Sequence, residues 1–219
     1  MTAKPIESCA MLLSSAALVV SALFTPLVAP VAAQESESES ASVREMAIGE
    51  PDAPVTVIEY ASFTCPHCAT SHKTVFPELK RAYVDTGKVR FVYREVYFDR
   101  PGLWASLVAR CGDGAHFFDI VDRIYSTQTE WTAVDDPASM VAGLREIGLS
   151  FGLSEPQLES CISDQQKAEA LVQWFRDNAR ADEISSTPSF VINGEKFSNM
   201  PFETLSAEID SRLPDQQQP

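Results

Sequence analysis

The chain has 219 residues, and 31 Asp and Glu outnumber 17 Lys and Arg, so its formal net charge is −14 at pH 7. A surface of this sign repels nucleic acid, which excludes nucleic acid as a partner. Hydrophobic residues make up 45% of the chain, enough to bury the core of one domain, with or without an insertion. We interpret the excess of acidic residues as a contribution to solubility.

The N-terminus has the pattern of a secretory signal peptide. Lys4 precedes an apolar stretch at residues 10–24, and small residues stand just before position 34. We predict that residues 1–33 are removed, together with Cys9, and that the rest of the chain works in the periplasm. The alternative is an uncleaved membrane anchor, because the apolar character runs on to residue 33, but Pro26 and Pro30 in this continuation disfavour a continuous spanning helix.

The next segments open a β-α-β unit. Residues 34–44 are acidic and low in complexity, and they predict a flexible leader. The β-branched run at residues 55–60 predicts a buried strand. Apolar residues at helical spacing then predict one helix from about Cys65 to Asp85, which Pro77 is expected to kink.

Residues 88–96 alternate as a second strand does, and the helical crossover predicts that it pairs parallel to the first. Helical periodicity dominates from 101 to 183, which predicts an inserted set of helices. Within it, Ser154 and Asp164 have the pattern of helix starts.

The C-terminal part predicts a β-hairpin and a helix. Asn193-Gly194 is a strong signal for a tight turn between two short strands. Leu205, Ile209 and Leu213 then fall on one stripe of a closing helix. Residues 214–219 are predicted to form a disordered tail.

The segment "FTCPHC" places two cysteines at the start of the first predicted helix. Cys65 is expected at the helix N-terminus, where free backbone N–H groups and the helix dipole stabilise a thiolate. His67 can add a donor or a positive charge, and Pro66 fits the first turn because it has no N–H to satisfy. Cys68 lies one turn further in and is the expected resolving cysteine. A low pKa at Cys65 stabilises the reduced form and makes the disulfide a strong oxidant.

A zinc site is the rival interpretation, with Cys65, Cys68, His67 and His72 as ligands. Structural zinc usually needs a second Cys/His pair, and the remaining histidine, His116, stands alone. We therefore predict no metal and no cofactor beyond the redox-active disulfide, with His72 and His116 at helix surfaces or boundaries. A purely structural staple is disfavoured because the closed loop is too short to constrain much chain.

Two motifs together resemble the DsbA-like branch of the thioredoxin superfamily: "VIEYASFTCPHC", and "STPSFVING" more than 100 residues later. The resemblance covers about residues 45–213 and includes the position and size of the helical insertion. It implies an α/β thioredoxin-like fold, with the thioredoxin-like domain formed by residues 45–100 and 184–213 and the helical insertion by 101–183.

The resemblance also implies roles for single residues. Cys65 is the attacking cysteine, Cys68 resolves, and His67 tunes the thiolate. Glu59 matches the family's buried acid, which helps to move the proton of the resolving thiol; from the sequence alone, a carboxylate at the edge of a strand is the simpler interpretation.

Pro188 matches the cis-proline that faces the disulfide, and Thr187 precedes it. The backbone of Thr187 would pair with an extended client chain. Cys111 and Cys161 are left over. An oxidising compartment and the resemblance favour a second, structural disulfide between them, and two separate buried thiols are the alternative.

The predicted function is a monomeric oxidase that donates its Cys65–Cys68 disulfide to reduced exported proteins and is reoxidised by a DsbB-like, quinone-linked membrane partner. Thr187 also occurs in reducing and isomerising relatives, so a disulfide isomerase or reductase stays open. Isomerases of this compartment usually carry an N-terminal dimerisation domain, and 20 residues between the predicted cleavage site and the first strand are too few for one. A maturation factor for one client, a metal carrier and a thiol-dependent chaperone are further alternatives.

Overall fold

The computed structural model describes residues 43–112 and 114–215. The predicted signal peptide, most of the predicted acidic leader and residues 216–219 of the predicted tail lie outside the described residues. Within the described ranges, no helix is both long and apolar enough to cross a membrane.

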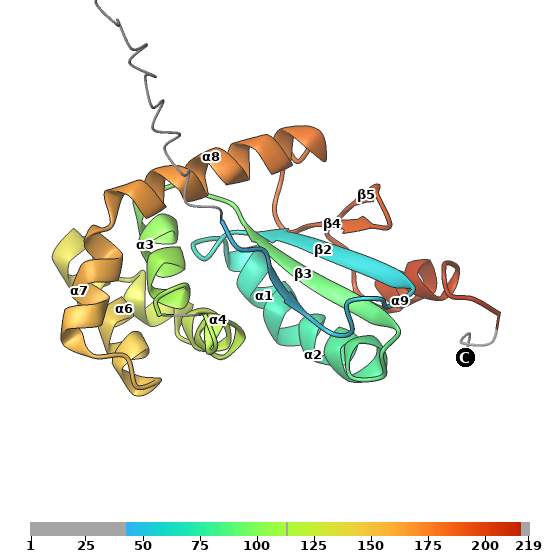
Figure 1. The fold of residues 1–219 in the computed structure, drawn as a ribbon, viewed down its shortest axis with the longest axis horizontal. Helices are drawn as coiled ribbons and strands as arrows, with labels where there is room; N and C mark the ends of the chain where they lie inside the picture. Colours follow the sequence, from blue (N-terminus) through green and yellow to red (C-terminus); the bar gives the residue numbers. More distant parts are fainter. Residues whose placement is uncertain (1–42, 113, 216–219) are drawn as a thin grey trace, which may run out of the picture. The chain divides into compact units, whose positions relative to one another are not determined.

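A five-stranded mixed sheet lies at the centre of the described chain (Figure 1). Its spatial order is β1 (Met46–Ile48), β3 (Val89–Glu95), β2 (Val55–Ala61), β4 (Ser189–Ile192) and β5 (Glu195–Ser198). β2 and β3 are parallel, as the helical crossover predicts, and every other pairing is antiparallel. β1 was not predicted from the sequence, and it pairs along the outer edge of β3.

The crossover between β2 and β3 is not the single helix that the sequence predicts. It consists of α1 (Pro66–Thr74), α2 (Phe76–Leu79) and a π-helical segment (Lys80–Val84). Pro77 has no N–H to donate to the preceding turn and its ring crowds that turn, so the regular ladder breaks at this point. The predicted helical range is therefore confirmed, but the helix is interrupted at Val75, two residues before Pro77, and is not one regular helix.

Between β3 and β4 the chain is helical, as predicted. The helices are α3 (Arg100–Ala109), α4 (Phe117–Ser126), α5 (Gln128–Trp131), α6 (Pro137–Ser150), α7 (Glu155–Ser163) and α8 (Gln165–Ala181). Both predicted helix starts are confirmed. The backbone N–H and hydroxyl of Ser154 donate to Oε1 of Gln157 at 2.9 and 2.8 Å, and the Asp164 carboxylate accepts from the N–H of Lys167 at 2.9 Å.

The C-terminal hairpin and helix are also confirmed. Asn193 and Gly194 have φ values of 47° and 87°, the positive φ at both positions that a type I′ turn requires. In α9 (Phe202–Asp210) and the turn after it, the predicted stripe of Leu205, Ile209 and Leu213 is buried.

One hydrophobic core joins the sheet to the inserted helices. The rings of Phe76 and Phe91 are 5.1 Å apart, Phe63 stacks on Tyr93 at 5.8 Å, and Phe117 of α4 meets Tyr93 edge-on at 5.9 Å. The described residues accordingly fall within one compact unit. The residue boundaries expected for the thioredoxin-like domain and its insertion stay a prediction.

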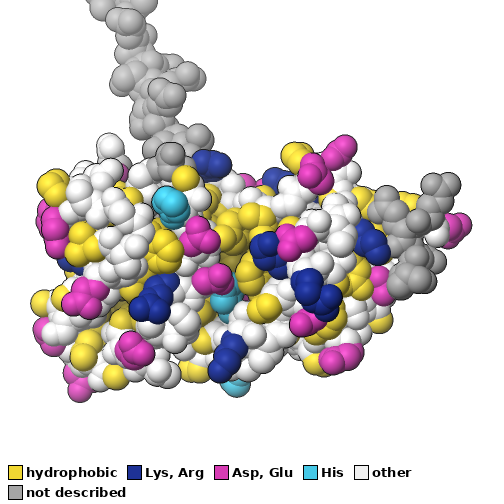
Figure 2. All heavy atoms as spheres, turned by 90° about the horizontal axis from the view of Figure 1, so that it is seen from below, with side chains coloured by type: hydrophobic (Ala, Val, Ile, Leu, Met, Phe, Trp, Pro, Cys, Tyr) yellow, Lys and Arg dark blue, Asp and Glu magenta, His cyan; other side chains and the backbone are white. Residues whose placement is uncertain are grey.

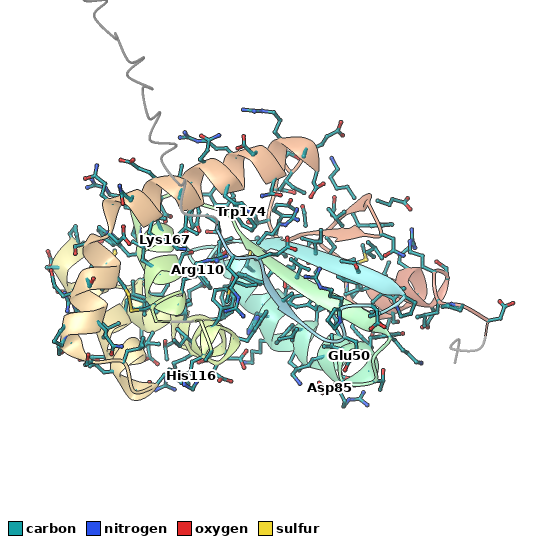
Figure 3. All side chains as sticks on the ribbon, viewed as in Figure 1. Glu50, Asp85, Arg110, His116, Lys167 and Trp174 are labelled. Carbon is teal, nitrogen blue, oxygen red and sulfur yellow. A yellow bond between two sulfur atoms is a disulfide. The ribbon has the colours of Figure 1, made fainter. Side chains whose placement is uncertain are left out.

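A buried ion pair fastens the insertion to the sheet. Arg110, just after α3, donates from Nε and Nη2 to the carboxylate of Glu95 on β3 at 2.5 and 2.7 Å. The two side chains are 4% and 0% exposed. The guanidinium also lies 5.7 Å from the ring of Trp174 on α8 (Figure 3). Removing one partner would leave the other charge buried without compensation.

Candidate active site

The two motif cysteines lie where β2 ends and α1 begins. Cys65 is the N-cap residue of α1 and is half-buried, Cys68 in the first turn is buried, and both are free thiols. Asp99 ties this loop to the insertion, because its carboxylate accepts from the hydroxyl of Thr64 at 2.8 Å and from the N–H of Gly102 in α3 at 2.8 Å. The loop geometry therefore depends on elements on both sides of the site.

Two residues of the insertion, neither of them predicted from the sequence, also hold this loop through hydrogen bonds. Nε2 of Gln128 donates to the carbonyl oxygens of Phe63 and Cys65 at 2.7 and 3.1 Å. The hydroxyl of Tyr125 donates to the carbonyl of Ser62 at 3.1 Å. These bonds satisfy buried carbonyl groups that precede the helix, and so they fix the position of the reactive sulfur.

The environment of Cys65 favours its thiolate. Partial burial raises the pKa of this thiol, but hydrogen bonds with Thr187, with the backbone and thiol of Cys68 and with the backbone of His67 outweigh burial, and the pKa is lowered. The position at a helix N-terminus acts in the same direction. Pro66 and the side chain of His67 are exposed at the rim of the site.

Cys68 has the opposite character. Burial strongly raises the pKa of its thiol, and the neighbouring charge of Cys65 raises it further. The N–H of Ser62 lies 3.5 Å from its sulfur. A buried thiol of this kind reacts only if a nearby group takes up its proton.

Glu59 is a buried carboxyl group on β2, 2% exposed. Desolvation raises its pKa from 4.5 to about 7, against smaller opposing effects of His72 and of a hydrogen bond with Ser71. Both Glu59 and Cys68 act electrostatically on the hydroxyl groups of Tyr93 and Tyr125, so the four groups form one buried cluster. An acid with a pKa of about 7 is suited to accept and return the proton of a buried thiol.

The second motif lies beside the first in the folded chain. The Thr187–Pro188 peptide bond is cis, and it immediately precedes β4, which pairs with β2. The carbonyl oxygen of Thr187 lies 3.7 Å from Sγ of Cys65. Residues separated by 122 positions therefore form the two sides of one site.

His72 corrects the sequence analysis, which expects it at a helix surface or boundary. Its side chain is 8% exposed, and Nε2 is hydrogen-bonded to Asp122 of α4. The ring stacks on Phe76 at 4.8 Å and lies 4.8 Å from the ring of Tyr125. Because α4 packs against α1, a position that the local sequence leaves polar becomes buried.

His116 lies at the exposed boundary before α4, as predicted. In the part of the chain that the structure describes, no group of three or more His, Cys, Asp and Glu is arranged to hold a metal ion. On the face seen in Figure 2, acidic and basic side chains are interspersed with hydrophobic ones rather than gathered into a field of one sign.

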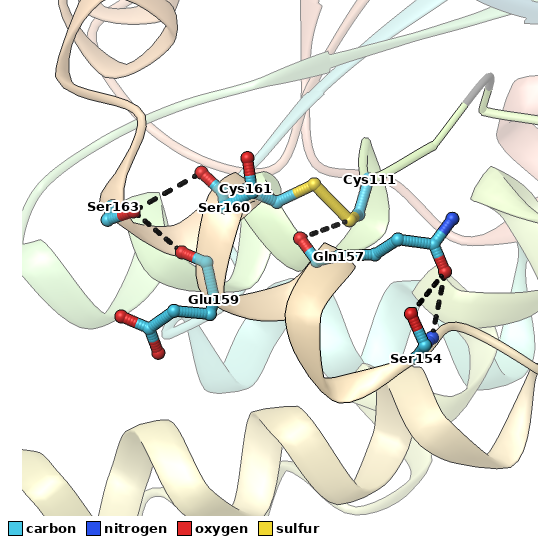
Figure 4. The surroundings of a disulfide bond; sticks show 7 residues. All are labelled: Cys111, Ser154, Gln157, Glu159, Ser160, Cys161 and Ser163. Atoms are coloured by element: carbon cyan, nitrogen blue, oxygen red, sulfur yellow. Dashed lines mark hydrogen bonds between the residues drawn. A yellow bond between two sulfur atoms is a disulfide. The ribbon is translucent and has the colours of Figure 1, made fainter.

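Cys111 and Cys161 form a disulfide that ties the segment after α3 to α7 (Figure 4). The bond spans 50 residues of sequence, and the two Cα atoms are 5.6 Å apart, within the usual range. The carbonyl oxygen of Gln157 lies 3.5 Å from Sγ of Cys111. The bond thus lies entirely within the helical insertion.

Comparisons with known proteins agree on one family. The thioredoxin family model matches residues 41–211. A relative from Rickettsia bellii, named "Putative protein-disulfide oxidoreductase", is 33% identical over 199 residues, which cover 88% of this chain and 76% of the relative. The counterpart from Rickettsia conorii is 33% identical over 175 residues, and the matched part spans 62% of its length.

Among solved structures, α-DsbA1 of Wolbachia pipientis has a TM-score of 0.71 and 26% identity, covering 77% of this chain and 90% of that one. This likeness confirms the predicted thioredoxin-like fold with its helical insertion. From the matched family, the relatives and this structure together, the chain belongs to the thioredoxin family, among the DsbA-like protein-disulfide oxidoreductases.

Proposed function

We propose that the chain oxidises thiols in exported proteins by donating its Cys65–Cys68 disulfide. A client thiolate attacks Sγ of Cys65, the Cys65–Cys68 bond breaks, and its electron pair leaves on Cys68, which takes a proton from Glu59. A second client thiolate then attacks the client sulfur of the mixed disulfide and displaces Cys65 as a thiolate. The client gains one disulfide, and the two electrons stay on the chain as a dithiol.

The observation that carries this proposal is the opposite shift of the two thiols. The lowered pKa of Cys65 makes it a good leaving group in the second step. The same stabilisation of the thiolate favours the reduced chain over its disulfide, and this makes the disulfide oxidising. The raised pKa of Cys68 keeps it protonated once it is released, so it does not compete as a nucleophile.

Thr187 and Pro188 are the proposed client-binding residues. Their loop lies beside Cys65 and leads into β4, so an extended client segment can pair with the backbone before the proline. Recognition through main-chain hydrogen bonds makes little demand on the client sequence. Such recognition suits an enzyme with many reduced or unfolded clients.

We place this activity in the periplasm, with a DsbB-like membrane oxidase as the reoxidising partner and the chain acting as a monomer. The signal-peptide pattern of residues 1–33 and the family support this placement. Isomerase or reductase activity is the alternative, because Thr187 occupies the position before the proline.

Trapping of clients tests the roles of the two cysteines. Cys68→Ser, mixed with proteins that carry disulfides, should accumulate mixed disulfides at Cys65, because the Cys65 thiolate can still open a client disulfide and no Cys68 thiol is left to release the client again. Cys65→Ser, the matched control, should form none. Full turnover by Cys68→Ser, measured as disulfide formation in a reduced unfolded protein, would contradict the proposed division of roles.

The contribution of His67 has its own test. His67→Ala should raise the pKa of Cys65 and make the disulfide less oxidising, because the variant lacks the imidazole that favours the thiolate. The pH profile of Cys65 alkylation measures the first effect, and equilibration with glutathione measures the second. No change in either would remove His67 from the mechanism.

A further inference from the structure

A cavity of about 760 Å³ lies between α1 and the helices α4 and α5. It begins beside the active site at Pro66, and its lining includes Lys73, Asp119 and Arg123. His72 and Asp122 also line it, and neither belongs to the redox motif. The cavity therefore brings charged groups close to the buried cluster beneath the cysteines.

His72 connects this cavity with that cluster. Its Nε2 is hydrogen-bonded to Asp122, whose side chain is 62% exposed. Its Nδ1 is buried and has no hydrogen-bond partner among the described residues. The ring also acts electrostatically on Glu59, and Ser71, which precedes His72 on α1, hydrogen-bonds to the same carboxyl group. One imidazole thus has an outer nitrogen on an exposed acid and a second, buried nitrogen free to accept or donate a proton.

Glu59 needs such a connection. Each catalytic cycle changes its protonation state twice, once when Cys68 is released and once when the disulfide re-forms. At 2% exposure its carboxyl group has no direct contact with bulk water. Once Glu59 has given its proton to Cys68 it is a buried carboxylate, which desolvation disfavours, and a route to water lets it regain a proton and release it again before Cys68 must be deprotonated.

We propose that His72 and Asp122 carry protons between Glu59 and the water of this cavity. When the Cys68 thiolate takes the proton of Glu59, the carboxylate regains one from Nδ1 of His72, and His72 takes up another at Nε2 from the cavity water on the Asp122 side. When Cys68 is deprotonated for reoxidation, the proton follows the reverse path. His72 ends each cycle unchanged, so it is a positioning and relay residue for the exchange.

The other titratable groups around this path are not suited to relay a proton between Glu59 and the cavity. Tyr93 from β3 and Tyr125 from α4 face Glu59, but burial raises the pKa of each well above 10, so both stay protonated. Lys73 and Arg123 line the cavity, and neither is among the groups that shift the pKa of Glu59. Around His72 itself, the facing groups are Asp122, Glu59 and the ring of Tyr125, with the ring of Phe76 stacked on one face.

The inference rests on the proposed dithiol–disulfide exchange. Single-turnover kinetics can test the proton route through His72 separately from the exchange itself. Reduced protein is mixed with oxidised glutathione, and acid quenching with mass spectrometry follows the mixed disulfide at Cys65 and its resolution by Cys68. His72→Ala should slow resolution about 10-fold or more at pH 7, at the lower end of general acid–base effects, and should leave formation of the mixed disulfide unchanged.

Added imidazole should restore the rate of His72→Ala, because the cavity admits it to the vacated position. Pyrrole, a ring of the same size without a basic nitrogen, should not restore it. Asp122→Asn should slow resolution as well. Asp119→Asn, which removes an exposed carboxylate from the same cavity, is the matched control and should stay within about 2-fold of the parent, since surface substitutions have small effects.

Resolution by His72→Ala at the parent rate, or equal rescue by imidazole and pyrrole, would overturn the proton route and leave the proposed function standing. If His72→Ala does not fold, His72→Gln decides instead, because it keeps a polar side chain of similar size but cannot relay a proton. A parent chain that forms no mixed disulfide with glutathione would contradict the proposed function itself.

Discussion

Glu59→Gln in the reduced protein should change how stability depends on pH. The pKa of Glu59 is about 7 in the folded chain, against 4.5 for a glutamate side chain exposed to water, as in the unfolded chain. Between these values the unfolded chain releases a proton that the folded chain keeps. Raising the pH through this window therefore favours unfolding, and the parent loses stability as the pH approaches and passes 7.

The size of the effect follows from the shift. A change from 4.5 to about 7 corresponds to about 3 kcal/mol at 1.36 kcal/mol per pKa unit. Most of it, about 2.5 kcal/mol, falls between pH 5 and pH 8. Glutamine has nearly the shape of the protonated acid and does not ionise, so its contribution does not change with pH. The free energy of unfolding of the variant minus that of the parent should therefore be about 2.5 kcal/mol larger at pH 8 than at pH 5.

Urea unfolding at pH 5 and pH 8, with the Cys65–Cys68 pair reduced, measures this difference. Glu50→Gln replaces an exposed glutamate and is the matched control, for which no such gain is expected. A stability difference between Glu59→Gln and the parent that is equal at the two pH values would refute a raised pKa at Glu59.

Three further predictions concern the framework of the site. Arg110→Met should lower the free energy of unfolding by about 3–5 kcal/mol, because it leaves the buried charge of Glu95 without a partner. Adding Glu95→Leu should recover most of this loss in urea titrations. No recovery would contradict a buried ion pair. Replacing Cys111 and Cys161 together by alanine should lower the free energy of unfolding by about 4 kcal/mol, as expected for a sequence separation of 50. The redox equilibrium of Cys65–Cys68 should not change, and a change would argue against a purely structural bond. Gln128→Ala should cost about 1–3 kcal/mol, because two buried carbonyl groups lose their donor, and should change the alkylation rate of the active-site thiol; an unaltered rate would separate Gln128 from the site.

Local patterns were sufficient for much of the fold. The β-branched run of β2, the alternation of β3 and the Asn193-Gly194 turn each carry their signal within a few residues, and each is confirmed. β1 has three residues, too few to display a period, and only its pairing with β3 defines it. The range of the first helix was predicted, but its interruption at Val75 and its π-helical end have no signal in the sequence beyond Pro77.

The residues of the site also fall into two groups, those that a local pattern identifies and those whose position depends on tertiary contacts. The cysteine pair and its helix N-terminus can be read locally, whereas the burial of Glu59 and the placing of Thr187 against Cys65 depend on strand pairing. His72 was misjudged because its polar neighbours indicate a surface, and only α4 covers it. Gln128 donates to backbone carbonyl groups more than 60 residues away, a relation with no pattern in the sequence.

The most direct measurement for the proposed oxidase is the redox equilibrium of Cys65–Cys68 against glutathione, with the pKa of Cys65 determined on the same sample. We predict a potential nearer to about −120 mV, the value of DsbA, than to about −270 mV, the value of thioredoxin, together with a pKa of Cys65 below that of an ordinary thiol. A potential close to that of thioredoxin would contradict the oxidase and favour a reductase on the same fold.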